Sequence, residues 1–121
     1  MPTVRLLILD DDPMVGQILL MAAQGAGCEA RWCERHEAFF EAVGEWQPTH
    51  VAVDMLMPDI SGRDVLHRLA AEGCMARVIV SSGLGTSELE EVLGEARLLG
   101  LQTAGVLPKP FSLAAVRALL V

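Results

Sequence analysis

Carboxylate side chains follow two apolar runs of the sequence. An aspartate triplet at residues 10–12 comes directly after the run at 4–9, and Asp54 comes after the run at 49–53. If both runs form neighbouring parallel strands, their ends meet at the sheet edge where open α/β folds bind ligands. Carboxylates held close together repel one another unless a proton or a cation intervenes. A hard divalent cation such as Mg²⁺ prefers oxygen ligands, so the pattern predicts a metal site suited to phosphoryl chemistry.

Strand-like and helix-like segments alternate along the whole chain. Asp12 followed by Pro13 is a typical helix start, with the aspartate as N-cap. Gly25 and Gly27 are typical of the end of that helix. Glycine, proline and polar residues separate the other segments. The sequence predicts strands at 4–9, 28–32, 49–53, 77–81 and 104–107, and further helices at 35–46, 63–72, 87–99 and 112–120.

This alternation predicts the fold class. Five strands alternating with five helices imply a parallel sheet that is covered on both faces, with right-handed crossovers. The length suits a flavodoxin-like (βα)5 doubly wound sheet of strand order 2-1-3-4-5, in which the first and third strands are neighbours. We expect one domain over residues 1–121, because 52% of the residues are hydrophobic and only 21% are charged.

Composition argues against several kinds of partner. The net charge is −7 and the nine Lys and Arg residues are scattered, which argues against direct binding of nucleic acid. No apolar run is long enough to span a membrane, and the N-terminus has no signal-peptide pattern. Cys28, Cys33 and Cys74 lack metal-type spacing, so we interpret them as reduced thiols of a cytoplasmic protein.

Two further polar side chains follow the fourth and fifth predicted strands, at the same edge as the aspartates. They are Ser82 and Lys109. A metal, a carboxylate nucleophile, a hydroxyl and a fixed ammonium are the groups that phosphoryl transfer needs. The two cations neutralise the phosphoryl oxygens, the hydroxyl donates a hydrogen bond, and the aspartate attacks in line.

These motifs resemble the receiver domains of two-component response regulators, and the resemblance covers essentially the whole chain. It rests on the segments 8–13, 53–62, 78–83 and 109–111. The resemblance implies that Asp54 accepts a phosphoryl group from a sensor histidine kinase or a phosphotransfer protein. It implies that Asp11, Asp54 and the backbone carbonyl of Leu56 bind Mg²⁺ directly, while Asp10 acts mainly through water.

The resemblance also assigns roles to the other two polar side chains. Ser82 would bind a phosphoryl oxygen and move on activation. Lys109 would pair with the acyl phosphate, and its peptide bond to Pro110 would be cis, as in typical members. The chain departs from the family pattern at Val106, where members usually carry an aromatic residue that rotates when the hydroxyl moves. The aromatic side chain on which such a switch depends is therefore missing from this sequence.

The sequence is compatible with two ways of passing on the signal. Residues 97–111 have a softer resemblance to receivers fused to EAL-type cyclic-di-GMP phosphodiesterase modules. This resemblance favours an output domain beyond Val121 over a natural single-domain regulator. The alternative is a homodimer through the last helices and strand.

Two other functions compete with the phosphorylated switch. An aspartate-nucleophile phosphatase needs a second acid two residues after the nucleophile, and Leu56 stands there, so we expect no enzyme beyond self-phosphorylation and dephosphorylation. A docking module that does not depend on phosphate stays possible because of Val106. We expect His36, His50 and His67 to lie at the surface or to be hydrogen-bonded, and Asp59 to be a turn residue.

Overall fold

The chain folds into one parallel sheet, as seen in a computed structural model that describes residues 3–83 and 85–120. The strand order is β2-β1-β3-β4-β5, so the predicted flavodoxin-like order 2-1-3-4-5 is confirmed. The strands are β1 (Arg5–Leu9), β2 (Glu29–Cys33), β3 (His50–Asp54), β4 (Arg77–Ser82) and β5 (Thr103–Pro108). Each lies within one or two residues of its predicted bounds.

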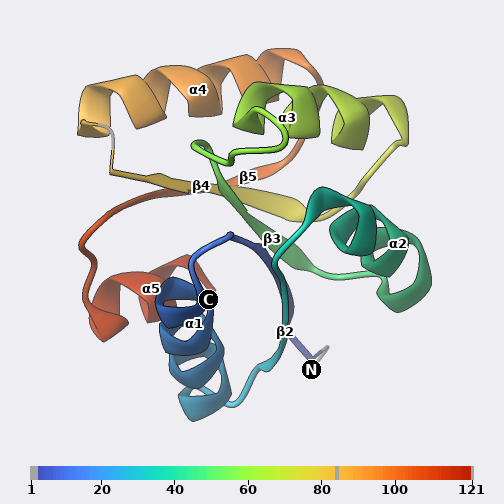
Figure 1. Cartoon of the computed structure of the whole chain (residues 1–121). Helices are drawn as coiled ribbons and strands as arrows, with labels where there is room; N and C mark the ends of the chain where they lie inside the picture. Colours follow the sequence, from blue (N-terminus) through green and yellow to red (C-terminus); the bar gives the residue numbers. More distant parts are fainter. Residues whose placement is uncertain (1–2, 84, 121) are drawn as a thin grey trace.

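Helices cover both faces of the sheet (Figure 1). They are α1 (Pro13–Gly25), α2 (His36–Trp46), α3 (Gly62–Ala71), α4 (Thr86–Leu98) and α5 (Leu113–Leu119). Helices α1 and α5 lie on one face of the sheet, and helices α2, α3 and α4 lie on the other. No helix in the described part of the chain is both long enough and apolar enough to cross a lipid bilayer.

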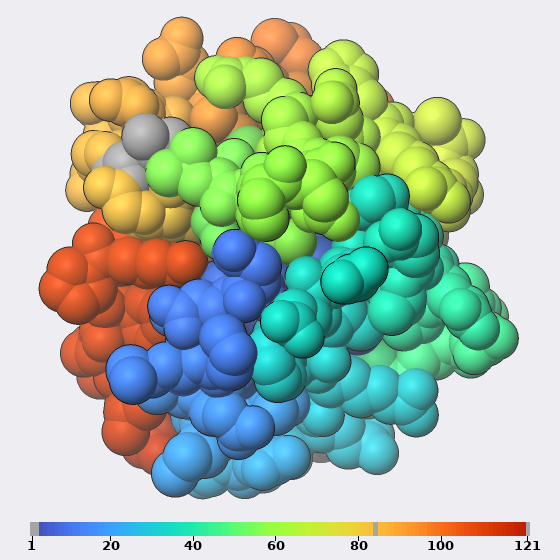
Figure 2. All heavy atoms as spheres, viewed as in Figure 1, coloured from blue at the N-terminus to red at the C-terminus, as the bar shows by residue number. Residues whose placement is uncertain are grey.

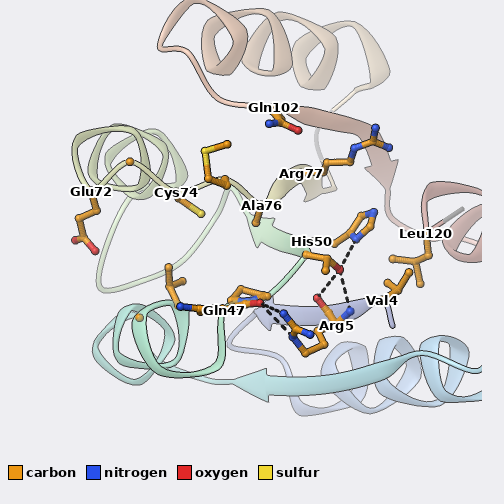
Figure 3. A pocket seen from close by; sticks show the side chains of 16 residues that line it. Val4, Arg5, Gln47, His50, Glu72, Cys74, Ala76, Arg77, Gln102 and Leu120 are labelled. Atoms are coloured by element: carbon orange, nitrogen blue, oxygen red, sulfur yellow. Dashed lines mark hydrogen bonds between the residues drawn. The ribbon is translucent and has the colours of Figure 1, made fainter. Parts of the chain in front are cut away.

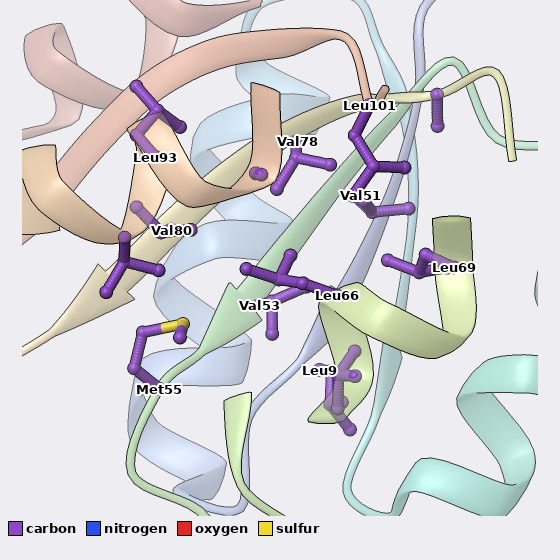
Figure 4. Close-up of a cluster of buried hydrophobic side chains, with 14 of the residues drawn as sticks. Leu9, Val51, Val53, Met55, Leu66, Leu69, Val78, Val80, Leu93 and Leu101 are labelled. Atoms are coloured by element: carbon purple, nitrogen blue, oxygen red, sulfur yellow. The ribbon is translucent and has the colours of Figure 1, made fainter. Parts of the chain in front are cut away.

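The central strands are buried on both faces, which explains why they read as continuous apolar runs. Along β1, Leu7 and Leu9 pack with α2, α3 and α4, and the intervening residues Leu6 and Ile8 pack with α1 and α5. The first of these two cores is drawn in Figure 4, where leucines and valines of the strands meet those of α3 and α4. Alternation along a strand therefore builds both layers.

Side-chain caps set where three helices begin. The Asp12 carboxylate accepts a hydrogen bond of 2.9 Å from the backbone N–H of Met14, which confirms the predicted N-cap. Ser61 and Ser112 cap α3 and α5 in the same way. Because these caps follow β1, β3 and β5, the chain turns sharply at the carboxyl edge of the sheet. In Figure 2 the segments after these three strands, in blue, green and red, lie side by side.

A close approach between α1 and β2 holds the first of these turns. Gly16 of α1 faces the indole of Trp32, and a Cβ added to the glycine would lie 2.5–2.6 Å from three ring atoms. The indole Nε1–H donates a hydrogen bond of 2.8 Å to the backbone carbonyl of Asp10. Only glycine leaves room for the ring, so this position connects the helix to the loop that carries the aspartates.

We expect Gly16→Ala to lower the free energy of unfolding by about 1–3 kcal/mol, because the added methyl group overpacks the contact with Trp32. Gly44→Ala is the matched control, since Gly44 also lies inside a helix but has no atom within 4 Å of an added Cβ. That change should raise stability by about 0.5–1 kcal/mol through helix propensity. Urea unfolding followed by circular dichroism measures both, and equal effects at the two positions would contradict the packing argument.

Candidate functional site

Three carboxylates meet at the carboxyl edge of the sheet, as the sequence predicted. One oxygen each from Asp10, Asp11 and Asp54 lies within 4.8 Å of the others. The reason is strand register: β1 pairs with β3 and Leu9 lies opposite Val53, so the next residues are neighbours. The side chains of Asp10 and Asp54 are almost completely buried, at 1% and 4% exposure. Burial makes their mutual repulsion a real cost to the fold.

Lys109 supplies the opposite charge. Its Nζ lies 2.9 Å from Oδ2 of Asp10 and 3.5 Å from Oδ2 of Asp54. The backbone N–H of Lys109 donates a hydrogen bond of 2.8 Å to the carbonyl of Ser82, which ties the loop after β5 to the end of β4. The peptide bond from Lys109 to Pro110 is cis, as predicted. The ammonium is thus held between two carboxylates from different strands.

Backbone N–H groups bind the other oxygens of the two buried carboxylates. The N–H of Asp12 donates to Oδ1 of Asp10 at 2.9 Å, and that of Leu56 donates to Oδ1 of Asp54 at 3.1 Å. Each carboxylate therefore has one oxygen fixed by its own loop and one directed toward Lys109. The orientation of both side chains is set by hydrogen bonds rather than by packing alone.

The surroundings of Asp54 disfavour the negative charge of its carboxylate. Burial raises the pKa of its carboxyl above the usual value of 3.8, and the neighbouring Asp10 and Asp11 add to the increase, while the Leu56 N–H and Lys109 oppose it. Burial alone would lower the pKa of the Lys109 ammonium, but its contacts with Asp10 and Asp54 outweigh burial and raise it. The site consequently carries more negative charge than one ammonium balances.

This excess of negative charge fits a bound divalent cation. All of the side-chain donors are carboxylate oxygens, which is the ligand type that Mg²⁺ prefers. Two of the three carboxylates are already oriented by hydrogen bonds. Leu56, whose backbone carbonyl was also predicted as a ligand, lies at the site through its N–H, and the role of its carbonyl stays a prediction.

Two adjacent serines end β4, and they differ in their surroundings. Ser81 lies opposite Asp54 in the sheet, and its hydroxyl donates a hydrogen bond of 3.0 Å to the carbonyl of Leu107. Its role is to join β4 to β5. Ser82, the residue predicted for the site, is completely buried at the strand end, and its backbone is bonded to Lys109.

Sequence reasoning missed two supporting residues. The indole N–H of Trp32 donates a hydrogen bond to the Asp10 carbonyl. Gly62 lies where an added Cβ would be 2.6 Å from the Cα of Met55, so the loop after Asp54 folds back closely only because no side chain is there. Neither role has a local sequence signal, because each depends on a residue distant in the sequence or on the fold of the loop.

The histidines behave in three different ways. His36 is half-buried and its Nδ1 lies 2.7 Å from a carboxylate oxygen of Asp59, so this aspartate links the β3–α3 loop to α2 as well as occupying a turn. His67 is exposed, as expected. His50 is buried, and its Nε2 has no hydrogen-bond partner among the described residues, so the expectation of a satisfied histidine is wrong at that atom.

The fold and the site define a small parallel α/β domain with an acidic pocket and an inward-pointing lysine. The family model described as response regulator receiver domain matches residues 6–121. The chain therefore belongs to the family of response regulator receiver domains, which act in two-component signalling.

Known relatives share this domain. The transcriptional regulatory protein FixJ of Azorhizobium caulinodans is 34% identical over 111 residues, which cover 92% of this chain and 50% of FixJ. The DNA-binding response regulator MtrA of Mycolicibacterium smegmatis is 29% identical over 90 residues, 74% of this chain and 39% of MtrA. The chain spans half the length of these relatives or less. Among solved structures, the chemotaxis protein CheY4 of Vibrio cholerae has a TM-score of 0.81 at 16% identity, covering 95% of this chain and 93% of CheY4, and so shares the fold.

The relatives do not support the expected link to EAL-type phosphodiesterase modules. Their names describe transcriptional and DNA-binding regulators. Residues 97–111, which carried that resemblance, form the end of α4, β5 and the loop with Lys109. These elements build the sheet and the acidic pocket, so their sequence reports the receiver fold and not the output.

We expect Asp54→Asn to raise the free energy of unfolding by about 1 kcal/mol at neutral pH without divalent cations, because it removes a buried charge whose pKa is raised. An aspartate with a raised pKa stabilises the fold most when protonated. The contribution of Asp54 to the stability of the wild-type fold therefore falls as the pH rises above 3.8, the usual pKa of the side chain. Urea unfolding of both proteins across this range should show the difference growing with pH. A variant that is less stable than wild type at neutral pH would contradict this electrostatic account.

Proposed function

We propose that residues 1–121 form one phosphoacceptor receiver domain and that Asp54 is the residue phosphorylated. The observation that carries the proposal is the position of this carboxylate. It ends the central strand β3, one oxygen is fixed by the Leu56 N–H, and the other faces Lys109 at 3.5 Å. The Asp54 carboxylate combines burial, a fixed orientation and two neighbouring acids with a raised pKa.

The proposed metal ligands are Asp11, Asp54 and the Leu56 carbonyl, with Asp10 acting mainly through water. Mg²⁺ bound there would neutralise charge on the phosphoryl oxygens and on the attacking carboxylate. The excess negative charge of the three aspartates supports this assignment.

The other steps belong to side chains of this chain. An oxygen of Asp54 forms a bond to phosphorus while the phosphorus–nitrogen bond of a donor phosphohistidine breaks. Lys109 then transfers its ion pair from the Asp54 carboxylate to a phosphoryl oxygen, and the Ser82 hydroxyl donates a hydrogen bond to another. The tie between the Lys109 N–H and the Ser82 carbonyl supports a joint movement of the two residues.

The signal is proposed to leave through α4, β5 and α5. Val106 lies opposite Val80 in the sheet and packs against the core of α2, α3 and α4. With valine in place of an aromatic residue, the switch would act by shifting the backbone of β5 and the start of α4. The output would be a homodimer or a further domain, and the names of the relatives favour a DNA-binding one.

The partners follow from the same proposal. The phosphoryl donor is a sensor histidine kinase or a phosphotransfer protein. The domain itself does not bind nucleic acid, since its net charge is −7. The free thiols of Cys28, Cys33 and Cys74 support a cytoplasmic location. With Leu56 at the position of a second acid, we propose no enzymatic activity beyond self-phosphorylation and dephosphorylation.

Incubation with acetyl phosphate and Mg²⁺ should add one phosphoryl group to the wild-type chain, detected by intact mass. Asp54→Asn should take up none, and omission of Mg²⁺ should abolish the addition. Asp59→Asn is the matched control, because it removes a carboxylate from the adjacent loop and should leave phosphorylation intact. If the wild type forms no adduct and beryllofluoride does not bind, the domain is a docking module that works without phosphate.

Metal binding can be measured separately through Trp32, whose indole is bonded to the Asp10 carbonyl. In a Trp46→Phe background we expect Mg²⁺ to change the remaining tryptophan fluorescence in a saturable manner. Asp11→Asn should weaken Mg²⁺ binding about tenfold or more, because a charged ligand is lost. Asp12→Asn removes the same charge but keeps a good N-cap, so it should have a smaller effect. Equal losses in the two variants would argue against Asp11 as a ligand.

A further inference from the structure

A cavity lies at the opposite end of the strands from the carboxylates. It has a volume of about 780 Å³ and opens where β1, β3 and β4 begin (Figure 3). Arg5, His50, Arg77 and Gln102 line it, and Leu120 closes one side. Pockets of this size that combine apolar walls with a few converging polar groups are typical of small-molecule sites. We call this cavity the basal cleft.

The basal cleft is positively charged although the chain as a whole is acidic. Arg5 and Arg77 both line it, and within the described ranges no carboxylate lies at ion-pair distance from either guanidinium. The one carboxylate among its described lining residues, Glu72, is bound by Arg68 at 2.7 Å. Two cations without a counter-charge favour an anionic ligand.

His50 brings a buried polar atom without a partner to the same cleft. The residue is only 6% exposed, and its Nε2 makes no hydrogen bond within the described structure. Burial, followed by the charge of Arg77, lowers the pKa of the imidazole from 6.5, so the ring is neutral at neutral pH. An unpartnered buried ring nitrogen is unusual, and a ligand atom in the basal cleft would satisfy it.

The hydrogen bonds of Thr49 are coupled to the tautomer of His50. The Thr49 hydroxyl accepts a hydrogen bond of 2.8 Å from the Arg5 N–H, and its single proton can go either to the Arg5 carbonyl at 3.2 Å or to Nδ1 of His50 at 2.9 Å. When that proton points to Nδ1, the ring proton of the neutral imidazole must be on Nε2. The nitrogen is then a donor, which is the form that binds an oxyanion.

Apolar residues form much of the remaining wall. Val4, Val43 and Met75 line the cleft together with Ala76 and Leu120. A fully hydrated inorganic anion would leave this surface exposed to water. An anion with a short hydrocarbon chain would cover it and gain from its burial.

We propose that the basal cleft binds a small organic carboxylate with a short apolar chain, held by the Arg77 guanidinium and the Nε2–H of His50. Arg77 is exposed and lies beside the imidazole in Figure 3, so a single carboxylate can meet both side chains. Binding selects the tautomer protonated at Nε2, with the Thr49 hydroxyl turned to Nδ1. This site is independent of Asp54 and its chemistry.

The test is a nuclear magnetic resonance titration of the full chain with hexanoate at neutral pH. We expect saturable shifts of the amide signals of His50 and Arg77, and long-range nitrogen–proton spectra should show the His50 ring proton on Nε2. Acetate tests the apolar wall and should bind more weakly. Hexylammonium has the same chain with the opposite charge and should not bind.

Two arginine variants test the charge at a specific place. Arg77→Gln should weaken hexanoate binding about tenfold, because a charged hydrogen-bond donor is lost. Arg35→Gln removes the same charge at the carboxyl edge of the sheet and should leave the affinity unchanged. Equal affinity in Arg77→Gln and wild type would overturn the proposal, as would a ring proton that stays on Nδ1 at saturation. Shifts that do not saturate would mean an adventitious additive only, and would overturn it equally.

Discussion

The approach of three carboxylates at one edge of the sheet is the constraint on which the rest of this structure depends. Asp10 and Asp54 are buried side by side, and each would be destabilising alone. The fold tolerates both charges for two reasons. Lys109 lies close to Oδ2 of each carboxylate, and a backbone N–H donates a hydrogen bond to Oδ1 of each. These compensations leave negative charge in excess. An excess of this kind is suited to a divalent cation with oxygen ligands.

Much of the surrounding structure serves to hold those groups in place. The cap at Asp12 and the Trp32 indole fix the loop after β1, and Gly62 allows the loop after β3 to fold back. The loop after β5 is tied to β4 through Ser82 and Lys109. This backbone hydrogen bond links the site to both β4 and β5.

The two edges of the sheet have opposite electrostatic character. The carboxyl edge gathers acids around one lysine, whereas the basal cleft holds a neutral His50 and two arginines, Arg5 and Arg77, that have no carboxylate partner among the described residues. The helices and buried strands between them keep the two charge systems apart. The two sites are joined through the strands of the sheet, because each lies at one end of them.

The sequence by itself determined the class of fold, the strand order and the members of the acidic site. Apolar runs, caps and glycines are local signals, and the carboxylates, Ser82 and Lys109 each follow a strand. Tertiary structure alone decided which oxygen faces Lys109, that Trp32 binds the Asp10 carbonyl, and that His50 is buried with an unpartnered nitrogen. These features arise between residues far apart in the chain. Their geometry depends on register and packing, which composition and periodicity do not encode locally.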